Sequence, residues 1–72
     1  MILFDPFWKK CEESGENWYT LHNKHGISFS TLHRLKHNKP ISTTTINDLC
    51  RILNCDVKDI ATYVPCDDDQ IL

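Results

Sequence analysis

Short apolar stripes at helical spacing, accompanied by capping residues, constrain the fold of this 72-residue chain most strongly. Residues at i, i+3, i+4 and i+7 lie on one side of an α-helix, whereas a half-buried strand alternates apolar and polar residues. Three complete stripes occur: Phe4, Phe7, Trp8 and Cys11, then Ile46, Leu49, Cys50 and Leu53, and finally Val57, Ile60, Ala61 and Val64. A chain built from such segments is expected to fold as a set of packed helices.

Capping residues predict where these helices begin and end, because Asn, Asp, Ser and Thr side chains accept hydrogen bonds from the first turn of a helix. Five short helices are expected, and Pro6 follows the first cap while Pro65 stops the last helix. The predicted segments, each with its cap, are 5–14 (Asp5), 17–24 (Asn17), 28–37 (Ser28), 42–53 (Ser42 or Thr43) and 56–64 (Asp56). With no strand predicted, the expected fold class is all-α.

The length allows one domain, which we assign to residues 1–66, followed by an acidic tail over residues 67–72. Only 2 Gly and 3 Pro argue against a turn-rich all-β fold. No apolar run approaches the roughly 18 residues of a membrane span, and residues 1–4 are too short for a signal peptide. We therefore expect a complete short protein that is cytoplasmic and has no membrane partner.

Four cysteines stand at 11, 50, 55 and 66, without C-x₂-C spacing. In the absence of a secretion signal they are read as reduced thiols. His33 and His37 are four residues apart, a spacing that can hold a metal, yet no four-ligand set accompanies them. No nucleophile, base and orienting group occur as a set either. We expect no metal, no cofactor and no enzymatic activity.

The net charge of −2 conceals an asymmetry along the chain. Between Asn17 and Asn47 there is no Asp or Glu, while four Lys and Arg residues and all four histidines lie there. The rest of the chain holds all ten acids and the other four bases. Small domains segregate charge by chance as well, but a local anionic partner such as nucleic acid explains the pattern directly.

The same stretch has the organisation of a helix-turn-helix unit over about residues 17–37. Two capped helices flank a turn with Gly26, and the expected inward positions are Leu21, Ile27, Leu32 and Leu35. In such a unit the first helix rests across the phosphate backbone and the second lies in the major groove. Charge and helix pattern thus point independently to the same residues.

The residues from Leu21 to Leu35, with Gly26-Ile27-Ser28 at the turn, resemble the phage Cro/repressor-type helix-turn-helix family. The likeness continues through Asn38-Lys39-Pro40 and the run from Ile46 to Ile60, and covers about residues 5–64. The resemblance implies a lambda-repressor-like fold. It also implies a sequence-specific regulator of transcription whose partner is double-stranded DNA. Of the two signs of regulation, repression is the one expected.

The family reads bases from the first, second and sixth positions of its recognition helix, which match Phe29, Ser30 and Arg34 here. Arg34 can bind guanine O6 and N7 with two hydrogen bonds. Phe29 could pack on a thymine methyl group, on the preceding helix or on a partner. The expected phosphate contacts are Asn17, Ser28, Thr31, His37, Lys39 and Thr43.

Two positions depart from the family pattern. Trp18 stands where the family usually has a polar residue that touches DNA, and His22 replaces a small Ala. Either the two helices separate slightly or His22 tilts outward. These aromatic residues and the net acidity also fit an alternative, a small antirepressor- or antitoxin-like interaction module that keeps the fold without specific DNA binding.

A homodimer would double the DNA contact. The candidate dimer segments are apolar and lie near the two ends of the chain: Ile2-Leu3-Phe4, Tyr63-Val64 and Ile71-Leu72. Each of them could instead close the core. No small-molecule effector is predicted.

Overall fold

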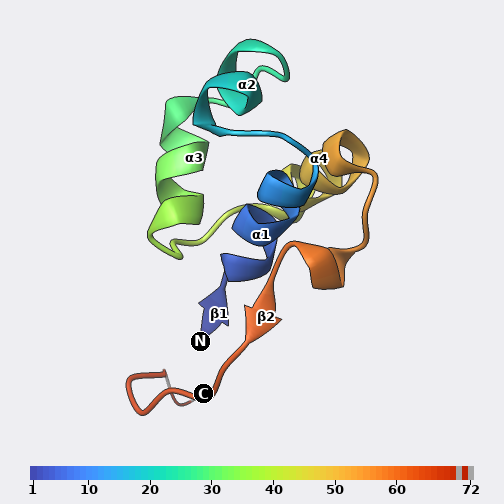
Figure 1. The fold of residues 1–72 in the computed structure, drawn as a ribbon. Coiled ribbons are helices and arrows are strands. Elements are labelled where there is room, and N and C mark those ends of the chain that lie inside the picture. Colours follow the sequence, from blue (N-terminus) through green and yellow to red (C-terminus); the bar gives the residue numbers. More distant parts are fainter. Residues whose placement is uncertain (70, 72) are drawn as a thin grey trace.

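Four short α-helices form the body of the domain, and a two-stranded ribbon closes one end (Figure 1). A computed structural model describes residues 1–69 and 71. Within that part of the chain the order is β1 (Ile2–Leu3), α1 (Asp5–Glu13), α2 (Trp18–Asn23), α3 (Phe29–Lys36), α4 (Thr43–Leu53), the 3₁₀ helix η1 (Val57–Asp59) and β2 (Thr62–Tyr63). None of the helices described is long and apolar enough to cross a membrane.

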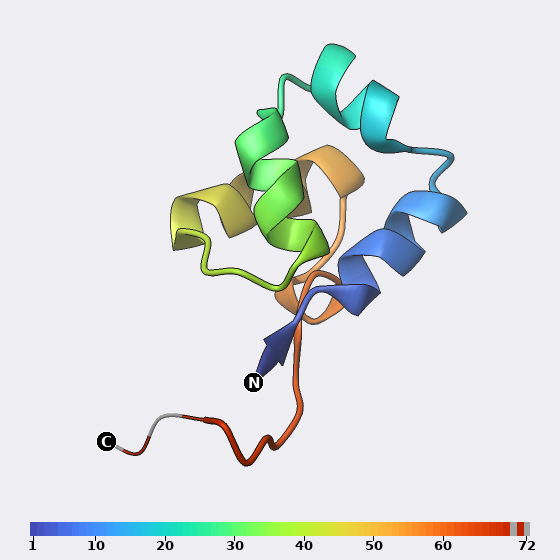
Figure 2. The ribbon, with the colours of Figure 1, turned by 90° about the vertical axis from the view of Figure 1, so that its left-hand side faces the viewer.

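Figures 1 and 2 place α2 at one end of the molecule and both chain ends at the other. In Figure 2 helix α3 lies in front of the domain, on its outer flank. Helix α2 is therefore far from the ribbon formed by β1 and β2 (Figure 1), whereas the chain just after α3 comes close to it, since the Asn38 side chain accepts from the Phe4 amide at 2.7 Å.

Each α-helix is followed closely by a residue with left-handed backbone geometry, namely Gly15, Gly26, Asn38 or Asn54. The amide of the next residue then bonds back into the last turn, as Lys39 N–H does to the Arg34 carbonyl at 2.8 Å. This geometry satisfies carbonyls that a helix end leaves free, and it turns the chain sharply. Short helices can thus follow one another with few connecting residues.

The apolar stripes expected from the sequence meet in one core. Its nine members share exposures below 10%, and they are Phe4, Phe7, Cys11, Leu21, Leu32, Leu35, Leu49, Leu53 and Ile60. Ile27 and Ile41, from the turns before α3 and α4, are partly buried against it. The core thus links the helix-turn-helix unit to α1 and α4.

Two predictions about the helices are wrong, namely the N-cap of the first helix and the existence of a fifth α-helix. Helix α1 has Phe4 at its N-cap, so Asp5 and Pro6 lie inside the first turn and Asp5 is no cap. The fifth helix is only the 3₁₀ turn η1, held by a reciprocal capping box between Asp56 and Asp59. Of its predicted apolar stripe, Ile60 is fully buried while Val57 is 55% exposed.

The prediction of no strand is also wrong, because Thr62–Tyr63 pairs antiparallel with Ile2–Leu3. The amide of Val64 bonds to the Met1 carbonyl at 2.8 Å, and the terminal amine of Met1 donates to the Val64 carbonyl at 2.7 Å. A partner about sixty residues away supplies these bonds, so local periodicity favoured a helix that tertiary pairing replaces.

Candidate nucleic-acid interface

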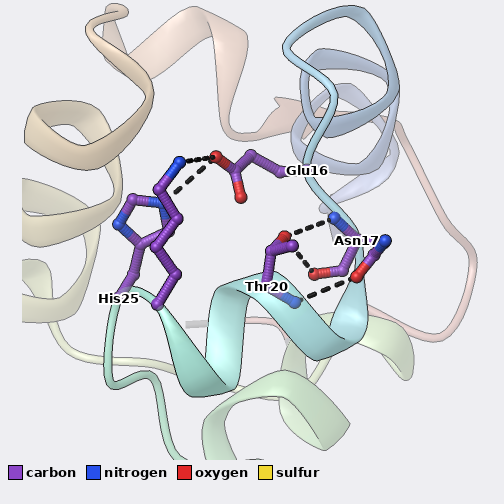
Figure 3. Close-up of polar contacts among 5 residues, drawn as sticks. Glu16, Asn17, Thr20 and His25 are labelled. Carbon is purple, nitrogen blue, oxygen red and sulfur yellow. Dashed lines mark hydrogen bonds and ion pairs between the residues drawn. The ribbon is translucent and has the colours of Figure 1, made fainter.

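Helix α2 begins with a complete capping box. The Asn17 side chain accepts from the Thr20 amide at 2.9 Å, and the Thr20 hydroxyl accepts from the Asn17 amide at 2.8 Å (Figure 3). The cap uses only the side-chain oxygen of Asn17, which is exposed. Its amide nitrogen keeps two donors that can bind another group.

A residue of the loop before α2 also contacts the residues that follow this helix. Glu16 precedes the cap, and its Oε1 accepts from His25 Nε2 at 3.1 Å and from Lys24 Nζ at 3.5 Å (Figure 3). The adjacent Thr20 hydroxyl, His25 and the charge of Lys24 lower the pKa of Glu16 to about 2. Thr20 donates its own hydrogen to the Asn17 carbonyl at 3.1 Å, so the hydrogen-bond partners of the carboxylate are His25 and Lys24. Among the described residues, Glu16 Oε2 is buried without a partner.

The turn between α2 and α3 is fixed by backbone bonds and by one side chain. Gly26 has φ +73, where a residue with a side chain would be strained, and the Ile27 amide bonds to the Leu21 carbonyl at 3.1 Å. His22 Nδ1 lies 2.9 Å from the Ile27 carbonyl. Because a carbonyl only accepts, Nδ1 carries the hydrogen and donates it.

Helix α3 packs one face against the core and exposes the other face to solvent. Ser28 caps it by accepting from the Thr31 amide at 3.1 Å, while Leu32 and Leu35 are fully buried. Trp8 of α1 donates from its indole nitrogen to the Leu35 carbonyl at 3.3 Å. This packing holds α3 against the core and leaves its outer face exposed to a partner.

The three predicted base-reading residues are all exposed on α3. Ser30 and Arg34 lie one turn apart, and the Arg34 guanidinium donates to Ser30 Oγ at 2.7 Å. Phe29 is 55% exposed and stacks on His22, with ring centroids 3.7 Å apart and planes 15° apart. The structure therefore brings Ser30 and Arg34 together and gives Phe29 a different neighbour on α2.

The predicted phosphate-contacting residues lie around the ends of α2, α3 and α4. Ser28 and Thr31 share a hydroxyl–hydroxyl bond of 3.0 Å at the start of α3, while Thr43 is the first residue of α4. Past the other end of α3, the His37 ring lies 4.4 Å from that of His33, and Lys39 is exposed. Asn17 completes the set at the start of α2.

No acid lies in the first turn of α2, α3 or α4, and their caps are the neutral residues Asn17, Ser28 and Ser42. Backbone amides at a helix N-terminus carry a partial positive charge that attracts anions. The last turn of α3 is basic, with His33, Arg34 and Lys36. The acid-free part of the chain thus combines amide donors at three helix N-termini with cationic side chains at the end of α3.

The thiols lie elsewhere and have few features of a reactive or metal-binding set. Burial above all raises the pKa of Cys11 to about 12, and burial also raises the pKa of Cys55. All four cysteines are free. Among residues 1–69 and 71, no group of three or more His, Cys, Asp or Glu side chains gathers as a metal site.

A family model for the Cro/C1-type HTH DNA-binding domain matches residues 7–66. The chain belongs to the Cro/C1-type helix-turn-helix family. The crystal structure of transcriptional regulator VanUg, Form II, is similar to it, with a TM-score of 0.80 and 30% sequence identity. The likeness covers 89% of this chain and 85% of that one. Among curated proteins, none matches the chain.

This Cro/C1-type domain accommodates its two unusual α2 residues by aromatic stacking. Trp18 stacks on Trp8 with centroids 5.8 Å apart and planes 4° apart, so it joins α2 to α1. His22 is half-buried and bonds to the turn while its ring faces Phe29. Sequence reasoning foresaw crowding at His22 and left packing of Phe29 on the preceding helix open, but it did not identify His22 as the stacking partner. It missed Glu16 altogether, since the Glu16 contacts depend on how the loop folds back.

Proposed function

We propose that this Cro/C1-type domain is a sequence-specific transcriptional regulator, a repressor, that reads the DNA major groove with α3. The observation that carries the proposal is the exposed Ser30–Arg34 pair, on a helix with no acid in its first turn and a basic last turn. A guanidinium matches guanine O6 and N7, and a hydroxyl accepting from it limits its orientations before binding. The VanUg regulator, which shares the fold, supports the regulatory role.

The neighbouring helix ends supply contacts that hold the reading helix in register. The Asn17 amide group, the Ser28 and Thr31 hydroxyls, His37, Lys39 and Thr43 are the proposed phosphate contacts. Such contacts fix position and orientation but carry no sequence information. In this arrangement α2 lies along the backbone, while Phe29, Ser30 and Arg34 face the base edges.

We further propose that two copies bind together through the ribbon end. Ile2 is 50% exposed and Tyr63 63% exposed, and they pair across β1 and β2. Val64 is exposed beside them, whereas Phe4 is buried and closes the core instead. Ile71 is exposed, and Leu72 lies outside the described residues. A dimer would read two half-sites about 34–36 Å apart.

Fluorescence anisotropy on a duplex selected from a random library tests the reading role. Arg34→Ala should lose about 5- to 150-fold of the preference for that duplex over random DNA, the usual range for one bidentate contact. Arg51→Ala is the matched control, because Arg51 is an exposed arginine on α4 that pairs with Asp48. It should keep the preference.

The salt dependence of the same titration separates the proposal from its alternative. Binding through several phosphates must weaken steeply as salt rises. If the protein binds no duplex even at low salt, the DNA-binding role is overturned, and an interaction module that uses Trp18 and Phe29 takes its place.

A further inference from the structure

Phe29 combines exposure with a fixed position. It is the first residue of α3 and is 55% exposed, although phenylalanine usually belongs to a core. Its ring lies flat against the His22 ring at 3.7 Å, with the planes only 15° apart. One face of the ring is therefore covered, while the exposed part remains open to a partner.

His22 holds its own ring in place through the turn. The bond from Nδ1–H to the Ile27 carbonyl, at 2.9 Å, attaches the imidazole to the chain just before α3. The side chain is half-buried, so it cannot swing freely. An Ala at this position would leave Phe29 without a stacking partner and free to change rotamer.

We infer that His22 and Phe29 together recognise the C5-methyl group of a pyrimidine in the major groove. This inference rests on the proposed function, because it requires α3 in the groove. A phenyl ring has neither donor nor acceptor, and the only apolar group on the major-groove edge of the ordinary base pairs is the thymine methyl. The 5-methylcytosine base carries the same methyl group at the same position, although the neighbouring group is an amino donor where thymine has a carbonyl acceptor.

Within this unit Phe29 touches the methyl group, and His22 is a positioning residue that acts through Phe29. The pair complements Ser30 and Arg34, the proposed polar readers of the helix, which are joined by a hydrogen bond. The two halves of α3 then read different chemistry: its start reads a methyl group, and the turn ending in Arg34 reads hydrogen-bonding edges.

Substitution of single bases in the selected duplex tests the inference. Each thymine is replaced by deoxyuridine, which removes only the methyl group, and binding is measured by anisotropy. One replacement should weaken wild-type binding about three- to fivefold, as expected for one buried methyl group. At that position 5-methylcytosine should bind more tightly than cytosine by a similar factor if the methyl alone is read. Should 5-methylcytosine give no gain there, the site reads thymine only.

The ratio of affinities for the thymine and uracil duplexes is then compared among variants, since this ratio does not depend on the fraction of folded protein. Phe29→Ala and His22→Ala should bring the ratio close to one, and His22→Phe, which keeps a stacking ring but loses the bond to the Ile27 carbonyl, should restore it in part. Val57→Ala is the control, because Val57 is also 55% exposed but lies on η1.

A wild-type ratio of one at every thymine overturns the inference, even if Arg34→Ala still abolishes the sequence preference and so supports the proposed function. A normal ratio in His22→Ala overturns the positioning role of His22. Absence of binding to any duplex at low salt overturns both the inference and the proposed function.

Discussion

The three helices that start within residues 17–47 differ from the other elements in the charge of their N-terminal residues. Helices α2, α3 and α4 have neutral caps and no acid in their first turns. In contrast, α1 carries Asp5 in its first turn, and η1 has Asp56 as its cap with Asp59 close behind. The hydrogen bonds are alike, since side-chain oxygens accept from backbone amides at α2, α3, α4 and η1.

This difference is not explained by stability. An acid near a helix N-terminus stabilises it by roughly 0.3–1 kcal/mol, and Asp caps about as well as Ser. Helices α2, α3 and α4 lack this stabilisation, whereas α1 and η1 have it. The neutral caps are explained if a negatively charged partner binds at these three N-termini, because an acidic cap would repel that partner.

The largest effect should come from breaking the core that both regions share. Leu35→Ala should lower the free energy of unfolding by about 2–5 kcal/mol, because Leu35 is fully buried and its loss leaves a cavity. Urea unfolding measures this. The neighbouring Arg34→Ala should change it by less than about 0.5 kcal/mol. Equal losses in the two variants would contradict the division of α3 into a packed face and a reading face.

A charge placed on the neutral region should separate stability from binding. Ser28→Asp keeps a capping oxygen, so the free energy of unfolding should hold or rise by up to about 1 kcal/mol. DNA affinity at low salt should fall about 10-fold or more, since a carboxylate would face a phosphate.

The reverse exchange at the acidic end, Asp56→Ser, is the control and should leave DNA affinity unchanged. If Ser28→Asp binds DNA as tightly as the wild type, the neutral caps have no role in binding.

The contacts of Glu16 around α2 can be tested through pH. Its pKa is about 2 in the folded protein, below the ordinary value of 4.5, so its stabilising effect is present above about pH 4.5. That effect is lost as the pH falls through about 2. Glu16→Gln should therefore cost about 1–2 kcal/mol at pH 7, typical of a hydrogen bond to a charged group, and much less near pH 2.

Urea unfolding at both pH values measures the difference, with the exposed Glu12→Gln as control. If the difference in unfolding free energy between Glu16→Gln and the wild type does not change with pH, the carboxylate charge is not what stabilises α2.

The smallest effect is expected at the ribbon end. The Met1 ammonium lies 2.8 Å from the Asp69 carboxylate, but both groups are well exposed. Exposed ion pairs contribute about 0–1 kcal/mol, so Asp69→Asn should lower the melting temperature by at most a few degrees. A large drop would mean that the acidic segment stabilises the ribbon and is not merely attached to it.

Sequence reasoning succeeded where the cause was local. Asn17, Ser28 and Ser42 cap helices within three residues of themselves, and Gly26 supplies the turn that the helix-turn-helix pattern requires. The same reasoning failed at Thr62–Tyr63, whose structure depends on pairing with Ile2–Leu3. Local periodicity cannot reveal a partner at the other end of the chain.

The candidate site shows the same limit. Exposure of Phe29, Ser30 and Arg34 follows from their places on α3, and the structure agrees with it. The stack of Phe29 on His22 does not follow, because it depends on the angle that the turn sets between two helices. Asn38 is similar. It follows the C-cap of α3 with φ 55, and its side chain accepts from the Phe4 amide at 2.7 Å, a contact with the residue after β1 that no spacing predicts.

The most direct test of which region binds DNA is an NMR titration of ¹⁵N-labelled protein with a mixed-sequence duplex at low salt, where non-specific binding is strongest. The account predicts amide shift changes at the starts of α2, α3 and α4 and along α3 to Lys39, with little change at Val57 on η1. Shift changes concentrated on β1, η1 and β2, with α3 unaffected, would contradict it.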